Sequence, residues 1–515
     1  MTRQKSEDPV VPEGGRKAAP TGPVQGGKGV PVVQGVEQLG LPFATAVNPK
    51  GTLTSRGADR SATRPTVRAP KASGKAGPTP HATMETVVEH LDEALDHVAR
   101  NKGAPGSDGR TIADVCKHWT QIRSRITQRL RNNAYAPGPA RRVDIPKPGG
   151  GVRTLSIPNV EDRVVQEAMR LTLQPHFEPS FHPSSHGFRP KRSCHTAIVE
   201  ASEYVANGRT WVVDVDLSKF FDRVHHQRLL ARVARKVDDR VLMRTLSRII
   251  RSTAVLPNGL LTRSEEGVPQ GGPLSPLLSN IALDELDWEL DRRGHRFVRY
   301  ADDIAVFVRS SRAGERVMQS LTRFIESRLR LAVNATKSAV HRSSGGNLLG
   351  FTLRRTSTGE VKVQLSRRSK ERLRAKIGEL TPRNWGSRLR WCIARLNRYL
   401  DGWFIYFGVA TPTARSVLRE IDAHMRRRLR AIQLKQWKRK RTIVRKLNRI
   451  KHTRSVARSV YADRKGWWVL SNLGVVTNRL GHRWFAEQGL ITLVERRQSR
   501  MLAMAAPAQQ SFGWG

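Results

Sequence analysis

The chain has 515 residues and a formal net charge of +47 at pH 7, which arises from 91 Lys and Arg residues against 44 Asp and Glu. This length is sufficient for roughly three to four domains. Hydrophobic residues form 38% of the sequence, so there is enough apolar material for sizeable cores, and a wholly disordered basic protein is excluded. Because so large an excess of charge destabilises a compact state, it indicates a polyanionic partner, and nucleic acid is favoured over a membrane surface.

Several other classes are excluded by what the sequence lacks. It contains no run of about 18 apolar residues that could span a membrane. The start at Met1 lacks the apolar region of a secretory signal. The three cysteines, Cys116, Cys194 and Cys392, include no C-x-x-C pair. A disulfide scaffold and a Cys-rich zinc site are therefore not expected, and a reducing, cytoplasmic location is predicted.

Residues 1–80 contain 12 Gly, 11 Pro and a single aromatic residue, Phe43. With almost nothing to bury, this segment is predicted to be a disordered basic leader. Residues 22–29 nearly match a phosphate-binding P-loop, but Gly29 replaces the required Ser or Thr. No strand is predicted before the segment and no helix after it, so a nucleotide site of that type is not expected.

Ordered structure is expected to begin near Thr83, which is a residue type that caps helices. Apolar residues then recur at helical spacing until Asn101. Residues 143–157 predict two short strands around a Gly-rich turn, and a helix is predicted to follow from Val160. Strand-like and helix-like segments then alternate irregularly to about residue 355, which predicts an α+β domain.

The sequence changes in character after Gln364, where Lys and Arg are interleaved with apolar residues at helical periods. Residues 425–451 contain 13 Lys and Arg and no acidic residue. A solvated helix face is the alternative explanation, but a cationic face this dense favours contact with nucleic-acid phosphates. The cations expected to make these contacts are Arg426, Arg427, Arg428, Lys435, Lys438, Arg439, Lys440 and Arg441. Residues 456–515, which include Trp467 and Trp468, predict a small appended module.

Two segments place acidic residues where burial makes them costly. In one predicted buried strand, period-two alternation puts Asp214 and Asp216 on the same face. Residues 297–308 predict a strand, a tight turn and a second strand, with Asp302 and Asp303 in the turn. Buried neighbouring carboxylates repel each other, and divalent cations such as Mg²⁺ resolve that repulsion. Pairing with some of the many arginines is the alternative for these acids.

These acids lie in a pattern that resembles a known family. Tyr300-Ala301-Asp302-Asp303, between apolar strands, matches the Tyr-x-Asp-Asp box of reverse transcriptases. Further segments match sequence blocks of the same enzymes in the same order, and these are residues 185–190, 216–222, 267–276, 334–337 and 348–351. Residues 101–109 and the basic helical region with Tyr399–Trp403 resemble one subgroup, the group II intron-encoded reverse transcriptases and maturases. The resemblance covers about residues 83–500.

The resemblance implies a set of catalytic acids. Asp216, Asp302 and Asp303 match the family's catalytic residues, which hold two Mg²⁺ ions. Asp216 is preferred to Asp214 because another aspartate, here Asp222, follows the family's first acid six positions later. In two-metal sites the ions lie about 3.5–4 Å apart, where one activates the attacking oxygen and the other stabilises the leaving oxygen.

Three residues match positions around the incoming nucleotide. Phe221 falls where an aromatic ring leaves no room for a 2′-hydroxyl, so selection of deoxynucleotides is expected. Gln270 and Gly271 resemble residues that line the incoming nucleotide and the template.

Three cations match positions around the triphosphate. Lys147 and Arg153 resemble the family's clamp on the triphosphate, a task for which the planar fork of Arg is suited. Lys337 resembles a proposed general acid for the pyrophosphate leaving group, and an ordinary phosphate contact is its alternative role.

The resemblance also implies the architecture. We expect an α+β right-hand polymerase fold, with fingers and an antiparallel palm sheet, followed by an α-helical thumb and maturase domain. The expected domains are a leader over residues 1–80, fingers and palm over 81–355, thumb and maturase (X) domain over 356–455, and a small DNA-binding-like tail over 456–515. No cysteine follows Cys392, so the zinc-supported H-N-H nuclease of many relatives is not expected.

The implied function is an RNA-directed DNA polymerase that binds its host group II intron RNA, assists its splicing and copies it into DNA during intron mobility. The expected partners are the intron RNA, a DNA target or primer and deoxynucleoside triphosphates, with no membrane and with a bacterial, nucleoid-associated location. A homodimer, a host role such as DNA repair, and a purely RNA-binding splicing cofactor stay open as alternatives. The long basic region disfavours a retron enzyme, and Pro269-Gln270-Gly271 disfavours a sequence-diversification enzyme.

Overall fold

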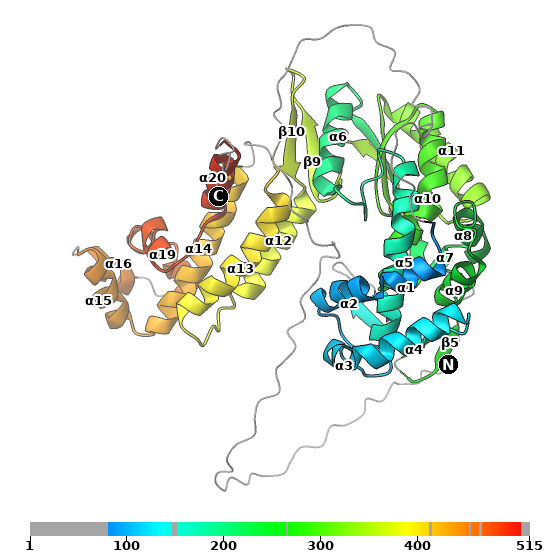
Figure 1. Ribbon diagram of the computed structural model, residues 1–515. Coiled ribbons are helices and arrows are strands. Elements are labelled where there is room, and N and C mark those ends of the chain that lie inside the picture. The colour runs from blue at the N-terminus through cyan, green and yellow to red at the C-terminus, as the bar shows by residue number, and fades with distance from the viewer. Residues whose placement is uncertain are drawn as a thin grey trace, which may run out of the picture. The chain divides into compact units, whose positions relative to one another are not determined.

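Figure 1 shows the computed structural model, which describes residues 81–146, 152–256, 258–263, 266–410, 415–452, 455–462 and 466–505. The predicted leader, its P-loop-like segment and Lys147 lie outside the described residues. The described chain is mixed α and β up to residue 365 and helical after it.

The first part of the described chain packs helices beside two strands. Its elements are α1 (Met84–Glu89), α2 (Leu91–Arg100), α3 (Ile112–Lys117), α4 (Trp119–Arg131), β1 (Ala140–Pro146), β2 (Val152–Ile157), α5 (Val160–Phe177) and η1 (Glu178–Ser180). Thr83 caps α1 as predicted, and the two predicted strands form an antiparallel pair. The single helix expected after Thr83 forms as two helices that meet at His90, whose ring Nδ1 lies 3.0 Å from Thr172 Oγ1.

The middle of the chain forms a central sheet with the strand order β6-β7-β3-β8. Its elements are α6 (Cys194–Ala206), β3 (Trp211–Val215), α7 (Phe220–Arg223), α8 (His226–Val233), α9 (Arg240–Ile250), β4 (Thr253–Val255), β5 (Leu261–Arg263), α10 (Ser275–Arg292), β6 (Arg296–Tyr300), β7 (Asp303–Val308), α11 (Ser311–Phe324), the π-helical turn η2 (Ile325–Leu329) and β8 (Ala339–Arg342). All pairings within the central sheet are antiparallel. The short strands β4 and β5 instead join the first two strands in a separate sheet, with the order β2-β1-β4-β5.

The central sheet is buried on both faces, and each face belongs to a different hydrophobic core. Val213 and Val306 face a core built with α10 and α11. Val212 and Phe307, one position along each strand, face a second core that includes α6 and the helices after residue 365. Successive side chains of a strand point to opposite faces, so alternation assigns neighbouring residues to different cores. Charged side chains are therefore favoured at the ends of these strands, where water and ligands have access.

After β9 (Phe351–Arg355) and β10 (Val361–Leu365), the described chain is helical. Its elements are α12 (Arg367–Leu380), α13 (Leu389–Phe407), α14 (Arg415–Trp437), α15 (Lys440–Ile450), α16 (Ser455–Ala462), α17 (Trp467–Leu470), α18 (Gly474–Thr477), α19 (His482–Glu487) and α20 (Leu493–Ala505). The long helix α14 packs against α12, α13, α15, α17 and α20. Asp422 of α14 accepts hydrogen bonds from Leu493 N at 2.9 Å and Val494 N at 3.1 Å, and it thereby caps α20. The last segment is therefore anchored on α14.

The predicted α+β class, with a helical region after it, is confirmed. Within the described ranges, no helix is both long enough and apolar enough to cross a bilayer.

Candidate active site

The turn between β6 and β7 carries two of the predicted acids. Tyr300 pairs with Asp303 across this hairpin, so Ala301 and Asp302 form its tip. Ala301 has a φ of 58°, a left-handed conformation that is uncommon for a residue with a Cβ atom. Gly187 packs directly against the turn, and a Cβ atom at that position would lie 2.2 Å from Ala301 N. The close approach requires glycine there.

Asp216 follows β3 at the same end of the central sheet. Val215, one residue earlier, pairs with the second residue of β7, so this register places Asp216 level with Asp303. The Asp216 backbone N–H donates to Ser338 Oγ at 3.0 Å, and the Asp216 carbonyl accepts from Asn334 N at 2.8 Å. The three predicted acids thus lie at one edge of one sheet.

These carboxylates repel one another. Burial, together with the charge of Asp216, raises the pKa of Asp302, while Arg153 opposes the rise. Part of Asp303 is exposed to solvent. Loss of solvation around its carboxyl group, together with the charges of the nearby aspartates, nevertheless raises the pKa of Asp303 to about 7. Lys337 Nζ lies 3.8 Å from Asp216 Oδ2. Negative charge therefore exceeds the positive charge that the surrounding residues supply.

The donor set at this edge suits a hard divalent cation. Carboxylate oxygens are the ligands that Mg²⁺ prefers, and a cation would relieve the repulsion between the acids. In the part of the chain that the structure describes, no three His, Cys, Asp or Glu side chains are grouped so that they could hold an ion by themselves. Asp216, Asp302 and Asp303 therefore fit an incomplete coordination shell, of the kind that substrate phosphates complete.

Backbone contacts tie the predicted nucleotide-binding residues together. Val268 N donates to Phe221 O at 2.6 Å, and Ser156 N donates to Gln270 O at 2.7 Å. Gly271 has a φ of 124°, and a Cβ atom there would lie 2.7 Å from Ser156 O. The loop with Gln270 is thus held between β2, which carries Arg153, and the segment with Phe221.

Asp214, the neighbouring acid on β3, has a different partner. Its Oδ2 lies 3.9 Å from His341 Nε2 on β8, and hydrogen bonding to Asp214 raises the pKa of His341. Asp214 also contributes negative charge around Asp303. It therefore lies beside the acidic edge but is engaged with β8.

Sequence reasoning missed Arg299, which holds the turn that carries Asp302 and Asp303. Arg299 of β6 and Asp287 of α10 are both 0% exposed, and Arg299 Nε donates to Asp287 Oδ1 at 2.7 Å. Arg299 Nη1 also donates to the Ala301 carbonyl at 2.9 Å. Its other N–H groups reach Asn280 Oδ1 and Ser185 Oγ.

Because the Ala301 carbonyl belongs to the peptide that leads into Asp302, this guanidinium fixes the backbone of the turn. The available signal was a cation inside an apolar strand.

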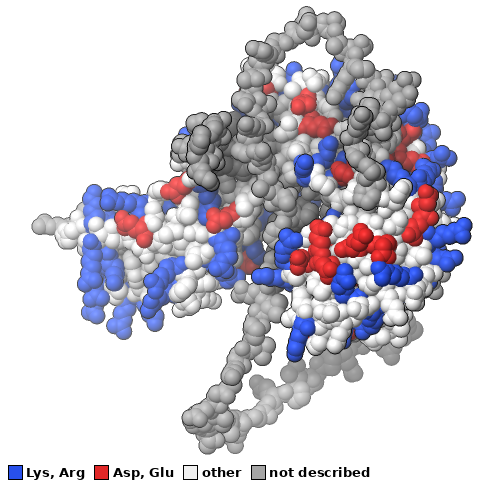
Figure 2. Space-filling view, in the orientation of Figure 1, with Lys and Arg blue, Asp and Glu red and all other residues white. Residues whose placement is uncertain are grey.

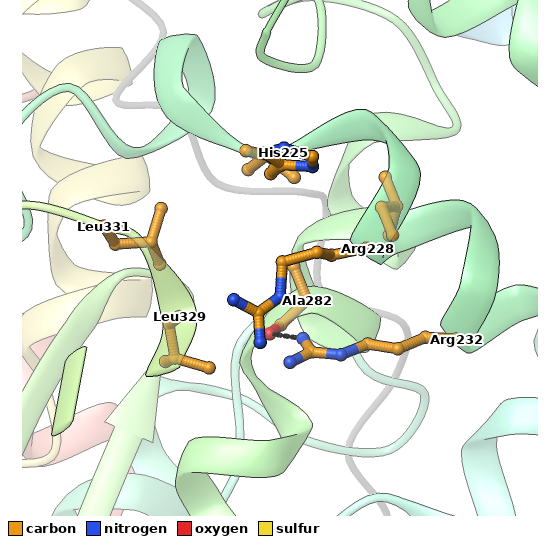
Figure 3. Close-up of a pocket in the computed structure, with 8 residues that line it drawn as sticks. His225, Arg228, Arg232, Ala282, Leu329 and Leu331 are labelled. Carbon is orange, nitrogen blue, oxygen red and sulfur yellow. Dashed lines mark hydrogen bonds between the residues drawn. The ribbon is translucent and has the colours of Figure 1, made fainter. Parts of the chain in front are cut away.

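A small pocket between α8, α10 and η2 contains none of the predicted site residues (Figure 3). Its walls are Leu329 and Leu331 on one side and Arg228 and Arg232 on the other. Arg232 donates to the Ala282 carbonyl and to Glu285, so its charge is used within the protein. This pocket is separate from the acidic edge.

The predicted phosphate-binding cations of the helical region differ in their surroundings. Four of them contact other parts of this region, and the contacts are Arg427 with the Trp468 ring, Arg428 with Thr381, Lys435 with Asn384 and Lys440 with Tyr461. Arg428 donates hydrogen bonds from both Nε and Nη2. Of these four cations, it therefore has the fewest donors left for a ligand. Lys438, Arg439 and Arg441 are exposed where α14 meets α15. Figure 2 shows Lys and Arg side chains gathered over the end of the helical region labelled α15 and α16 in Figure 1.

Comparison with known proteins assigns the two regions separately. Residues 145–353 match the family model "Reverse transcriptase (RNA-dependent DNA polymerase)", and residues 370–451 match "Group II intron, maturase-specific domain". Protein YkfC of Escherichia coli (strain K12) is 34% identical over 352 residues, which are 59% of this chain and 91% of YkfC. The chain belongs to the group II intron reverse transcriptase and maturase family. Its reverse transcriptase domain contains all three acids and the turn.

A second relative and a solved structure show lower identity to this chain. Group II intron-encoded protein LtrA of Lactococcus lactis subsp. cremoris is 28% identical over 336 residues, which are 52% of this chain and 55% of LtrA. The chain thus spans about half the length of LtrA. A solved "Cas6-RT-Cas1--Cas2 complex" aligns with 22% identity and a TM-score of 0.32, over 47% of this chain and 26% of that one, a similarity too low to support an argument. Membership of the family implies nucleic-acid binding and the use of a divalent metal ion.

Arg299→Lys should lower kcat for DNA synthesis by about tenfold to a hundredfold, because an ammonium cannot bridge Asp287 and the Ala301 carbonyl and the turn loses its position. Template–primer affinity should stay within twofold, and the Mg²⁺ concentration for half-maximal activity should rise. Arg430→Lys is the matched control, because it changes another buried guanidinium, which donates to Ser471 O at 2.7 Å in the helical region. An equal loss in both variants, or an unchanged Mg²⁺ requirement in Arg299→Lys, would contradict the positioning role.

Proposed function

We propose that the protein is an RNA-directed DNA polymerase that binds its host group II intron RNA, assists its splicing and copies it into DNA during intron mobility. The observation that carries this proposal is the convergence of Asp216, Asp302 and Asp303 at one sheet edge, in a chain that also has a maturase-specific segment. The intact acids favour an active polymerase over a purely RNA-binding cofactor.

We further propose a right-hand arrangement in which the β2-β1-β4-β5 sheet and the helices around it are the fingers and the central sheet is the palm. In this arrangement residues 81–355 are fingers and palm, residues 356–455 are thumb and maturase domain, and residues 456–515 are a DNA-binding-like tail. The change from mixed structure to helices comes later than the first of these boundaries, because β10 (Val361–Leu365) lies beyond residue 355 and α12 begins at Arg367. The anchoring of α20 on Asp422 ties the described part of the tail to the thumb.

The chemistry proposed for the acidic edge is nucleotidyl transfer. Two Mg²⁺ ions held by Asp216, Asp302 and Asp303 would supply activation of the primer 3′-hydroxyl and stabilisation of the departing pyrophosphate. Arg299 keeps the two turn carboxylates in place by holding the Ala301 carbonyl. The hydrogen bonds from Asp216 N–H to Ser338 and from Asn334 to the Asp216 carbonyl do the same for the third acid.

Cations around the edge would receive the triphosphate. Arg153 on β2 lies close enough to Asp302 to affect its pKa, and a planar guanidinium suits two phosphate oxygens. Lys337, 63% exposed and 3.8 Å from Asp216, is placed to contact the leaving phosphates and to give them a proton. Lys147 is proposed as a second clamp from the sequence resemblance alone. Phe221, half-buried beside the loop with Gln270 and Gly271, would wall the sugar.

The proposed partners are the intron RNA, a DNA target or primer and deoxynucleoside triphosphates, in a bacterial cytoplasm where the protein associates with the nucleoid. The exposed cations Lys438, Arg439 and Arg441, and the half-buried Arg426 earlier on α14, are proposed to contact RNA phosphates. A related enzyme used for DNA repair would share the acidic edge, so binding of the intron RNA, rather than DNA synthesis, is the test of the intron partner.

Asp302→Asn should reduce DNA synthesis on a template–primer by on the order of 10³-fold or more, because it removes a metal ligand while leaving the surface nearly unchanged. RNA binding should stay close to wild type, which a filter-binding titration measures. Asp214→Asn is the matched control, since Asp214 is engaged with His341, and it should retain extension. Near-wild-type extension by Asp302→Asn would overturn the catalytic assignment.

Phe221→Val should raise incorporation of ribonucleotides relative to deoxynucleotides, because the proposed barrier is a steric clash with the 2′-hydroxyl. Phe221→Tyr keeps the ring and should keep the selectivity. The ratio of the two kcat/KM values in single-nucleotide extension measures the effect. An unchanged ratio in Phe221→Val would make Phe221 an aromatic of the core edge rather than the sugar gate.

Replacing Lys438, Arg439 and Arg441 with Gln should flatten the slope of log affinity against log salt for intron RNA by roughly two to three units, at ~0.7–0.9 per lost phosphate contact. The control replaces Arg123, Arg292 and Arg367, which are exposed but paired with Asp92, Glu289 and Glu371. Both triple variants lose three positive charges. The salt slopes of the two variants should therefore differ only if Lys438, Arg439 and Arg441 form a surface that binds RNA. Equal slopes would support a solvated helix face.

A further inference from the structure

The end of the central sheet opposite the acids is lined with arginines. Each strand contributes one at this end: Arg296 begins β6, Arg309 follows the last residue of β7, Arg209 lies two residues before β3, and Arg342 ends β8. The register confirms their common position, because Trp211 at the start of β3 pairs with both Val308 and Arg342. We call Arg209, Arg296, Arg309 and Arg342 the distal arginine rim.

The rim crosses the whole width of the sheet. With neighbouring strands about 4.8 Å apart, four strands span ~14 Å. The rim is also well separated from the catalytic turn, since the six positions from Asp303 to Arg309 correspond to roughly 20 Å along β7. It is therefore a surface distinct from the nucleotide-binding edge of the same sheet.

Three of the rim guanidinium groups lie near one another, since Arg209 is close enough to Arg296 and Arg309 for their charges to affect it. Burial and the charges of Arg309 and Arg296 lower the pKa of Arg209. The Arg342 guanidinium lies over the Trp211 ring, 5.1 Å from its centroid, which orients its planar face. Among the ion pairs found in the described ranges, none joins a rim arginine to an Asp or Glu. By contrast Arg299, inside the same sheet, is fully paired with Asp287.

Clustering like charges without partners destabilises the fold, and nothing in the packing of the sheet requires it. Both faces of the sheet are covered by the two cores, and at this end Arg309 and Arg342 are exposed while Arg209 and Arg296 are half-buried. Arg342 pairs with Trp211 and Arg296 pairs with Phe307, so strand alternation directs these two arginines to opposite faces at the same end of the sheet. Guanidinium groups bind phosphate oxygens in a bidentate manner, so arginines gathered at this end suit a phosphate backbone that crosses it.

We propose that the distal arginine rim binds the phosphates of a structured RNA segment while the opposite edge of the sheet carries out DNA synthesis. The proposal rests on the proposed function only in naming RNA as the polyanion. Since the template and primer end at the acidic edge, the rim serves a part of the RNA that is not being copied. The sheet would thus position a folded RNA at one end and the growing strand at the other.

The test compares wild type with a variant that carries Arg209→Gln, Arg309→Gln and Arg342→Gln. The probe is a folded group II intron transcript, with binding measured at several salt concentrations. Affinity should fall about tenfold to a hundredfold at low salt, and the slope against log salt should flatten by roughly two to three units. The corresponding triple Lys variant keeps the charge and should retain most of the affinity and the slope. Extension of a short template–primer should equal that of wild type.

The control is the triple variant of Arg123, Arg292 and Arg367, whose charges are paired with acids. An RNA affinity and slope equal to wild type, or a loss no greater than in this control, would overturn the proposal. A loss confined to a DNA duplex would also overturn it, because the rim would then serve the target DNA. If the wild-type protein proved unable to extend a primer, the proposed polymerase function would fail, while weaker RNA binding by the rim variant would still support the rim.

Discussion

The structure depends on a four-stranded sheet that is covered on both faces. Alternate side chains of each strand enter different hydrophobic cores, one built with α10 and α11 and the other with α6 and the later helices. Uncompensated charge inside either core would be costly, so charge is confined to the two ends of the strands. The carboxylates collect at one end and arginines at the other, and the sheet itself separates them by its strand length.

A buried charged pair between the sheet and α10 illustrates the same constraint. Arg299 and Asp287 are fully enclosed, and every group on the guanidinium has an acceptor nearby. Such pairs are weak evidence for stability, because desolvation offsets most of their attraction. This pair has a geometric consequence instead, since the same guanidinium fixes the Ala301 carbonyl in a left-handed turn. The pair therefore adds little to the net stability of the fold, and its main effect is to define the position of the Asp302 and Asp303 carboxylates.

The helical region uses its cations in two ways. Arg428 and Arg430 donate to backbone and hydroxyl groups of neighbouring segments, so they hold helices together. Lys438, Arg439 and Arg441 stay exposed where α14 ends and α15 begins. A helix as rich in Arg and Lys as α14 must bury some of these side chains, and those near other helices find acceptors there. Charge density alone therefore overstates the surface available to RNA.

The sequence by itself determined the strand, turn and strand around Asp302 and Asp303, the hairpin before Val160, the α+β class and the change to helices after Gln364. It did so because period-two and helical patterns, together with turn residues, are local properties of the chain. The sequence also indicated the family, because several segments match sequence blocks of reverse transcriptases in the same order along the chain. It missed the break at His90, because the helical pattern continues through that position. Only the tertiary structure paired Arg299 with Asp287, separated exposed cations from internal ones and aligned four distant arginines at one end of a sheet. Those features depend on strand order and register, which bring together residues far apart in the chain and leave no periodic trace in it.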